Sequence, residues 1–305
     1  MRHFLSLKDF SRTTLWSILN RAKELKSARR RGERLSSLTG KILAMLFEKP
    51  STRTRVSFEV GIKELGGDVI FLGANEVGLG KREAVKDVSR TLSRYVHGVI
   101  IRTFSHDRLL EFADCSSVPV VNALTDLLHP CQALSDVFTV WERFPVLEDI
   151  RVLFIGDGNN VLHSLLFASA QFGFSLVVLT PKDYRPSPII LAEAEELAIK
   201  NFSRTSIHLI SSVEEIGKVD VVYTDVWVSM GQEKQRDVKL RDFKGFQVNE
   251  SLLEKIGNPW VMHCLPAHRG EEVTDSVLDG ARSIVFDQAE NRLHVQKAIL
   301  EWLWK

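Results

Sequence analysis

The sequence predicts an α/β protein with two doubly wound parallel-sheet domains joined by inter-domain helices. Short β-branched runs alternate with longer helical patterns along nearly all of the 305 residues, and this alternation is typical of parallel strands with helices on both faces. The runs form two series, separated by the helical pattern "HPCQALSDVFTVWERFP" at 129–145. The chain is long enough for two domains. We therefore expect one domain at 1–135, which also takes the segment 289–305, and a second domain at 136–288.

Each series has its own expected strands and helices. In the first series, helices are expected near 52–65 and 83–95, and the double glycine at 66–67 stops the former. The strands of the first series are expected at 41–47, 68–72, 98–102 and 118–121. Those of the second are expected at 151–156, 175–180, 206–210, 220–225, 260–266 and 283–287. Ligands bind at the carboxyl ends of strands in such sheets, so the polar residues that follow each strand are the candidates for a site.

The composition excludes several classes of protein. Hydrophobic residues make up 44% of the chain and charged residues 26%, and the formal net charge is +1. This balance gives no electrostatic reason to expect nucleic acid or an anionic membrane as a partner. The three cysteines form no CxxC pair, which indicates reduced thiols in the cytoplasm. The N-terminal stretch lacks the apolar core of a signal peptide, and no run reaches the ~18 apolar residues of a membrane span.

The stretch "FEKPSTRTRVSFE" (47–59) crowds arginines and hydroxyl residues into the point where a strand ends and a helix begins. The first N–H groups of a helix are unpaired and lie at the positive end of its dipole. The side chains that add hydrogen-bond donors there, and so suit a phosphate, are Ser51, Thr52, Arg53 and Thr54. The alternative is an ordinary helix cap with two surface arginines. Two arginines in the first turn oppose the dipole, so we favour an anion site.

Three more polar residues lie at the ends of predicted elements in the first series. Arg102 ends the apolar run "GVIIR", where it can enter a cleft or form a strand-end ion pair. His129 and Gln132 are three residues apart, on one face of a helix that has Pro130 at its first position. A histidine at a helix N-terminus is held neutral and can donate a hydrogen bond to a carbonyl, although this histidine can equally be a structural cap.

A glycine loop in the second series, "FIGDGNNVLHS" (154–164), partly matches the dinucleotide-binding pattern GxGxxG. It has Gly156 and Gly158, but Val161 occupies the third glycine position, and the motif is weak even when it is complete. An NAD-dependent oxidoreductase is therefore kept as an alternative. Asn159 and Asn160 instead offer amide groups at the start of a helix.

Further polar groups follow the later strands. Asp225 comes directly after a strand, and Ser229 and Met230 follow it in a loop with a hydroxyl group and a flexible apolar arm. Covalent catalysis by Cys264 and its neighbouring histidine is disfavoured, because adjacent residues on a strand point to opposite faces. Arg292, near the start of the last helix, is another possible contact for an anion. No CxH or HxxH set suggests a metal site.

Five motifs, STRTR, HPCQ, DxxxSMG, HCLP and AENR, occur in the order and spacing of the carbamoyltransferases. From about Lys41 onward the chain resembles the aspartate/ornithine carbamoyltransferase family, and its SMG motif resembles that of the members that use ornithine. The resemblance implies two doubly wound α/β domains, a homotrimer or a multiple of trimers, and no metal or organic cofactor. It also implies transfer of the carbamoyl group from carbamoyl phosphate to the δ-amine of L-ornithine, which gives L-citrulline and phosphate.

The resemblance implies a role for each matching residue. Those that would bind carbamoyl phosphate are Ser51, Thr52, Arg53, Thr54, Arg102, His129, Gln132, Cys264, Leu265 and Arg292. Within this set, Arg102, His129 and Thr54 would polarise the carbamoyl oxygen. Gln132 and the backbone carbonyls of Cys264 and Leu265 would hold the carbamoyl NH2 group. The residues that would bind ornithine are Asn160, Asp225, Ser229 and Met230, and those assigned to catalysis are Arg102, His129, Cys264 and Asp225.

One position departs from the family pattern. In the family, a residue of the loop that here reads "ANEVGLGKRE", often glutamine, reaches the carbamoyl phosphate of a neighbouring subunit. The matching position is Gly78, which has no side chain for that contact. We expect either Lys81, Arg82 or the backbone to substitute, or the contact to be weaker.

Other readings of the sequence remain open at this point. A carbamoyltransferase for putrescine, an N-acylated ornithine or aspartate is the nearest alternative. Aspartate needs a cation for its side-chain carboxylate, and Asp225 has the wrong sign; putrescine has no α-carboxylate for Asn160 to meet. A non-catalytic binding protein of the same fold is disfavoured, because every expected polar group is present.

Overall fold

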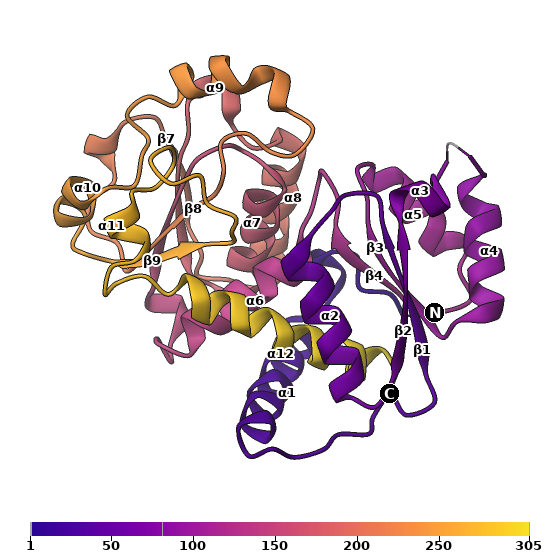
Figure 1. Cartoon of the computed structure of the whole chain (residues 1–305). Helices are drawn as coiled ribbons and strands as arrows, with labels where there is room; N and C mark the ends of the chain where they lie inside the picture. The colour runs from indigo at the N-terminus through magenta and orange to yellow at the C-terminus, as the bar shows by residue number, and fades with distance from the viewer. Residues whose placement is uncertain (1, 81, 305) are drawn as a thin grey trace. The chain divides into compact units, whose positions relative to one another are not determined.

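The computed structural model describes residues 2–80 and 82–304 and divides the chain into two compact units (Figure 1). Unit 1 comprises Met1–Phe138 and Glu290–Lys305, and unit 2 comprises Thr139–Ala289. The divisions fall inside the helices α6 (Pro130–Trp141) and α12 (Val285–Leu303). Each unit contains one parallel sheet, which confirms the predicted fold class.

The sheet of unit 1 has four parallel strands in the order β2-β1-β3-β4. The strands are β1 (Ile42–Phe47), β2 (Asp68–Gly73), β3 (Gly98–Arg102) and β4 (Val120–Leu124). The helices, besides α6 and α12, are η1 (Leu7–Asp9), α1 (Arg12–Arg30), α2 (Thr52–Glu64), α3 (Ala74–Val77), α4 (Val85–Tyr95) and α5 (His106–Cys115).

Alternate residues of the unit 1 strands point to opposite faces of the sheet. Ala44, Leu46 and Ile101 face a buried cluster that α4 and α5 complete (Figure 1). The helices α1, α2 and α12 pack on one another, since Lys26 Nζ donates to Asn291 Oδ1 at 2.8 Å. A Cβ atom at Gly61 would lie 3.1 Å from Lys297 Cγ, so the glycine permits the close approach of α2 and α12.

The sheet of unit 2 has five parallel strands in the order β7-β6-β5-β8-β9. The strands are β5 (Arg151–Ile155), β6 (Ser175–Leu179), β7 (Ile207–Ile210), β8 (Val221–Thr224) and β9 (Trp260–His263). The helices are η2 (Leu147–Asp149), α7 (Asn160–Phe172), η3 (Lys182–Tyr184), α8 (Pro188–Lys200), η4 (Val213–Glu215), η5 (Glu233–Gln235), α9 (Arg236–Asp242), α10 (Glu250–Lys255) and α11 (Asp275–Leu278). One face of this sheet packs on α10 and α11 through a continuous apolar core.

Both sheets reverse their winding direction at one point. In unit 1 the chain goes from β1 outward to β2 and then returns to β3 on the other side of β1. In unit 2 it goes from β5 through β6 to β7 and returns to β8 on the other side of β5. Ligands of open α/β sheets bind at the carboxyl ends of the strands at such switch points. The residues that follow β1 and β3, and those that follow β5 and β8, are therefore the places to look for a site.

Three strand predictions need correction. The strand expected at 260–266 ends at His263. No strand forms at 283–287: Ser283 makes only an isolated bridge with Val261, and α12 already begins at Val285. The segment "SIVFD" has only three apolar residues, too few for their periodicity to separate a strand from the first turn of a helix. The strand expected at 118–121 runs instead from Val120 to Leu124, after Pro119, which has no N–H to donate to a sheet.

Within 2–80 and 82–304, no helix is both long and apolar enough to span a membrane.

Candidate active site

The N-terminus of α2 presents the hydroxyl-rich turn that the sequence predicts. Ser51 caps the helix, with its side chain accepting a hydrogen bond from the Thr54 N–H at 3.3 Å. The first turn contains no acidic residue. Arg55 does not belong to this group, because its Nε donates to Glu59 at 2.9 Å and its guanidinium lies 3.8 Å from the ring centre of Phe71. Of the two arginines, Arg53 is the one that stays assigned to the predicted anion site.

Arg292 ties α12 to the other predicted residues of unit 1. Its Nη2 donates to Thr54 Oγ1 at 3.0 Å and its Nη1 donates to Gln132 Oε1 at 2.6 Å. The Gln132 amide then donates to Asp136 Oδ1 at 2.8 Å, which fixes its orientation. All four side chains are buried. Arg292 is the eighth residue of α12, so the expectation that it lies near the start of that helix is wrong.

His129 lies just before α6 and is buried among cations. Burial lowers the pKa of its imidazole well below the usual value, and the charges of Arg292 and Arg102 lower that pKa further. The ring is therefore neutral at neutral pH and can donate a hydrogen bond without carrying a charge. The sequence predicts the neutral state from the helix dipole, whereas the causes in the structure are burial and two guanidinium groups.

Strand register brings these residues to one edge of the unit 1 sheet. Phe47, the last residue of β1, pairs with Arg102, which in turn pairs with Leu124 at the end of β4. The segments that lead to α2 and to α6 therefore leave the sheet at the same edge as Arg102. This edge is the switch point between β1 and β3. The unit 1 residues predicted to bind an anionic ligand include the cations Arg53, Arg102 and Arg292, and we call the whole set the cationic group: Ser51, Thr52, Arg53, Thr54, Arg102, His129, Gln132 and Arg292.

Asp225 occupies the corresponding position in unit 2. It follows β8 directly and is 6% exposed. Its Oδ2 accepts from Asn159 Nδ2 at 2.7 Å, and its Oδ1 accepts from Cys264 Sγ at 3.0 Å. Asn159 follows β5 and also caps α7, accepting from the N–H groups of the next turn. The Asn159–Asp225 bond therefore spans the switch point between β5 and β8.

The sequence predicts amide groups from both Asn159 and Asn160 at this helix start, but only Asn160 is expected to bind the ligand. Asn160 is the first residue of α7, directly beside the cap. Ser229 and Met230 lie in the loop after Asp225, where Met230 is 43% exposed. Asn159 could have been recognised as a helix cap from "DGNNV", but its partner lies far away in the sequence. The residues of unit 2 that we call the Asp225 cluster are Asn159, Asn160, Asp225, Ser229, Met230 and Cys264.

The turn after β9 is held by a buried histidine. The Leu265 N–H donates to His263 Nδ1 at 2.8 Å, so the ring proton is on Nε2, which lies 3.0 Å from Glu272 Oε1. Leu265 has a φ of 57°, a left-handed conformation that this contact helps to hold. The turn fixes where the carbonyls of Cys264 and Leu265 point, and both residues lie in unit 2 with Asp225.

Two groups of side chains among the described residues have metal-ligand atoms close together, and the histidine of the first group is already engaged. The donor atoms of Asp225, His263 and Cys264 lie within 4.8 Å of one another. Both ring nitrogens of His263 are engaged, by the Leu265 N–H and by Glu272, so this imidazole has no lone pair to offer an ion. In the second group, the Oε1 atom of Glu272 also accepts from the His268 N–H at 2.6 Å.

The glycine loop after β5 is shaped by packing of the chain on itself. A Cβ atom at Gly158 would lie 2.5 Å from the backbone of Arg185 and Pro186. The Gly158 N–H donates to the Tyr184 carbonyl at 2.8 Å. The glycine is therefore required by a neighbouring segment of unit 2, and the dinucleotide-binding alternative loses the observation on which it rested.

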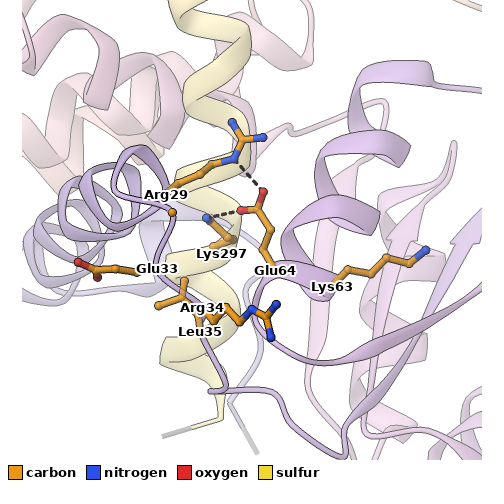
Figure 2. Close-up of a pocket in the computed structure, with 8 residues that line it drawn as sticks. Arg29, Glu33, Arg34, Leu35, Lys63, Glu64 and Lys297 are labelled. Carbon is orange, nitrogen blue, oxygen red and sulfur yellow. Dashed lines mark hydrogen bonds and ion pairs between the residues drawn. The ribbon is translucent and has the colours of Figure 1, made fainter.

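Figure 2 shows a pocket of about 410 Å³ in unit 1 that is lined by none of the predicted site residues. Glu64 lies between two of its cations and accepts from Arg29 at 2.8 Å and from Lys297 at 2.7 Å. The helices α1 and α2 end beside it with the negative ends of their dipoles. Two of the four basic side chains that line the pocket are therefore already paired with a carboxylate.

The backbone accounts for glycine at position 78. Gly78 ends α3 with a φ of 53°, in the left-handed region that favours glycine. Arg82 Nη1 donates to the Glu76 carbonyl at 3.4 Å within this loop. The other basic residue considered for the missing contact, Lys81, lies outside the described residues.

Comparisons with known proteins show to which family the chain is similar. The family model "Aspartate/ornithine carbamoyltransferase, carbamoyl-P binding domain" matches residues 2–142, and the model of the "Asp/Orn binding domain" of the same family matches residues 148–303. The chain is 48% identical to ornithine carbamoyltransferase of Archaeoglobus fulgidus, over 98% of this chain and 96% of the relative.

Solved structures give the same result. The ornithine carbamoyltransferase of Pyrococcus furiosus is similar with a TM-score of 0.94 and 45% identity, over 98% of this chain and 96% of that one. The anabolic ornithine carbamoyltransferase of Campylobacter jejuni is similar with a TM-score of 0.92 and 41% identity, over 99% of both chains.

Proposed function

Since the chain belongs to the aspartate/ornithine carbamoyltransferase family, we propose that it transfers the carbamoyl group of carbamoyl phosphate to the δ-amine of L-ornithine, giving L-citrulline and phosphate. Unit 1 would bind carbamoyl phosphate and unit 2 would bind ornithine. The descriptions of the two family models, which match these parts of the chain, support that division.

The observation that decides the choice of amine is the sign of the charge at the switch point of unit 2. Asp225 offers a carboxylate, held by Asn159 and Cys264, which suits the α-ammonium of an amino acid. An aspartate acceptor would need a cation for its second carboxylate, and none of the residues of the Asp225 cluster is a cation. Asn160 would meet the α-carboxylate of ornithine, with Ser229 and Met230 completing the subsite.

Carbamoyl phosphate would bind to the cationic group. The N-terminal turn of α2, with Ser51, Thr52 and Arg53, would hold the phosphate. Thr54 accepts from Arg292, so its own hydroxyl hydrogen is left to donate to the ligand. Gln132, oriented by Arg292 and Asp136, would meet the carbamoyl NH2 group together with the carbonyls of Cys264 and Leu265.

The reaction would proceed by direct attack of the neutral δ-amine on the carbamoyl carbon. The C–N bond forms as the carbonyl electrons move onto oxygen, and Arg102, neutral His129 and Thr54 would stabilise that oxyanion. The intermediate then breaks its bond to the phosphate oxygen, and the departing phosphate would accept the proton that the amine loses. Holding both substrates in one orientation would supply much of the rate enhancement.

A homotrimer, or a multiple of trimers, in the cytoplasm is part of the same proposal and rests on family membership. Gly78 has no side chain for the contact that other members make to a neighbouring subunit. The trimer would therefore depend less on this loop for its active site. Sedimentation equilibrium measures the mass of the assembly, and a monomer at working concentration would contradict this part.

The test of the function is citrulline formation with purified protein, carbamoyl phosphate and ornithine. Putrescine, N-acetylornithine and aspartate serve as competing acceptors in parallel assays. We expect kcat/KM for ornithine to exceed each of the others by at least about 100-fold, because a site built around charged groups rejects a substrate that leaves them unpaired. A higher value for another acceptor would transfer the assignment to that amine. Absence of product with every acceptor would refute the enzyme assignment.

A further inference from the structure

A lysine is buried beside the Asp225 cluster. Lys239 lies on α9, is 2% exposed and has all three ammonium hydrogens in use. Its Nζ donates to Asp157 Oδ2 at 2.5 Å, to Gln232 Oε1 at 2.7 Å and to the Trp227 carbonyl at 2.9 Å. Lysine is almost never buried to this extent unless it is paired, so these contacts must offset the loss of its hydration.

The three acceptors lie at both ends of one loop and at the end of a strand. Trp227 precedes Ser229 and Met230, and Gln232 follows them. The Gln232 N–H also donates to the Ser229 carbonyl at 3.0 Å, which closes the turn. The Lys239 ammonium therefore pins together the two ends of the segment 227–232. It also fixes this segment to Asp157, which follows β5 at the switch point.

Aromatic packing holds the base of the loop and leaves its tip accessible. The Trp227 ring stacks on Phe243 with 5.3 Å between ring centres, and Tyr184 packs on the same Phe243 at 4.8 Å. Lys239 Nζ lies 5.4 Å from the centre of the Tyr184 ring. Met230, in contrast, is 43% exposed. The lysine thus acts on a loop that is fixed at its base and presents its tip to a ligand.

The charge of Lys239 also compensates one of two neighbouring carboxylates, that of Asp157, and not that of Asp225. Asp157 is buried, and burial raises its pKa; the nearby charge of Asp225 raises that pKa as well, while Lys239 lowers it. With the ammonium in place, the charge of Asp157 is compensated. Asp225 is then left as the net negative charge of the trio, which matches one α-ammonium group.

We propose that Lys239 is a positioning residue for the amino-acid subsite: it holds Ser229 and Met230 in place and compensates Asp157, so that Asp225 alone faces the α-ammonium. This rests on the proposed function for the identity of the amino acid. Lys239 touches neither substrate in this scheme. Its loss should weaken use of the amino acid and leave carbamoyl phosphate binding unchanged.

The test compares Lys239→Met with the double variant Lys239→Met/Asp157→Asn. The double variant removes both charges and so avoids an uncompensated buried carboxylate, which could prevent the single variant from folding. We expect KM for ornithine to rise at least about tenfold in both variants, while Kd for carbamoyl phosphate, measured by calorimetry, stays within about twofold. Amide hydrogen exchange in 227–232 should be faster in both.

The matched control is Lys255→Met, which removes another lysine of unit 2, one paired with Glu214 at the surface at 3.3 Å. It should change none of the three measurements. An unchanged KM for ornithine in the double variant would overturn the proposal. Equal weakening of both substrates would overturn it too, since that is the mark of a merely structural lysine. If the wild type forms no citrulline from ornithine, the proposed function fails, and the exchange rates of 227–232 then report separately on whether the tether exists.

Discussion

Both units reverse the winding of a parallel sheet, and they build groups of opposite charge at that point. In unit 1 the switch point between β1 and β3 gathers guanidinium groups around a neutral histidine, and Arg292 locks Thr54 and Gln132 together. In unit 2 the switch point between β5 and β8 gathers a carboxylate that accepts from an amide and a thiol. The fold therefore fixes where each group lies, and the side chains decide which charge it binds.

The two groups also differ in how they are supported. The cationic group is anchored in helices and strand ends, and the hydrogen bonds from Arg292 to Thr54 and Gln132 join buried side chains. The Asp225 cluster is completed by the loop 227–232, and Lys239 joins the two ends of this loop. We infer that carbamoyl phosphate meets a largely formed subsite, and that the amino acid meets one whose tip can adjust.

Removal of Arg53 should give the largest effect and should be confined to the anion. We expect Arg53→Ala to weaken carbamoyl phosphate binding by about 2–4 kcal/mol, the scale for losing one partner of a charge-assisted pair. Arg55→Ala is the control, because Arg55 is already paired with Glu59. Calorimetric titration with carbamoyl phosphate measures both. Unchanged affinity in Arg53→Ala would show that this arginine is a surface charge, and unit 1 would lose part of its contrast with unit 2.

The corresponding change in unit 2 is Asp225→Asn. It should lower kcat/KM for ornithine by about 2–3 kcal/mol, because the α-ammonium loses its charged partner. Carbamoyl phosphate binding should remain nearly intact, since that ligand belongs to the other group. Steady-state kinetics with each substrate varied in turn provides the test. Equal losses for both substrates would mean that Asp225 supports the fold instead of the subsite.

The burial of His129 beside two guanidinium groups should make the stability of the protein depend on pH. Its folded pKa lies well below the ordinary value of 6.5, so the unfolded chain binds the proton more readily. This histidine therefore costs stability as the pH falls below its unfolded pKa, by up to about 1.4 kcal/mol per pH unit. Relative to His129→Gln, wild type should lose free energy of unfolding between about pH 7 and about pH 5.5, measured by urea titration. Parallel curves for the two proteins would contradict the buried, neutral state.

A smaller effect should distinguish the cap at Asn159 from an ordinary cap. Asn159→Ala and Asn249→Ala each remove an asparagine cap from a helix of unit 2, and each should cost about 1 kcal/mol of stability. Only Asn159→Ala also removes a donor to Asp225, so only it should raise KM for ornithine, by about five- to tenfold. Thermal unfolding and kinetics on both variants separate the two roles. A similar rise in KM for Asn249→Ala would point to a general loss of stability.

The smallest effect is expected for Cys264. In Cys264→Ser the hydroxyl can still donate to Asp225, and the backbone carbonyls are retained, so kcat should stay within about threefold of wild type. Mass spectrometry of the protein during turnover gives a second reading. A carbamoyl group found on the Cys264 thiol would replace direct attack by a covalent route.

The positions of most strands and of both charged groups could be predicted from the sequence. The buried strands are β-branched runs, and the polar residues directly after them, such as Arg102 and Asp225, lie where parallel-sheet topology requires. The partners of those residues could not be predicted in the same way. Arg292 and Thr54 are 238 positions apart, and Asn159 and Asp225 are 66 apart.

The errors have local physical causes. The strand expected at 283–287 is wrong because the three apolar residues of this segment fit either element. Ile284 and Val285 are buried, and burial is equally compatible with a strand and with a helix. Lys239 escaped notice because a lysine in a charged helical stretch is normally a solvated one. Lys239 can be buried because the fold brings three acceptors around its ammonium group, and those acceptors cannot be recognised from the sequence.

The division of unit 1 into two pieces of chain affects the order in which the protein can be completed during synthesis. Unit 2 is one continuous segment, 139–289, whereas unit 1 needs the segment from Glu290 onward, which is made after all of unit 2. Domains generally fold as the chain emerges from the ribosome, from the N-terminus first. A nascent chain that already contains Thr54 and Gln132 still lacks Arg292, their shared donor. The subsite nearest the beginning of the chain is therefore the last to be finished.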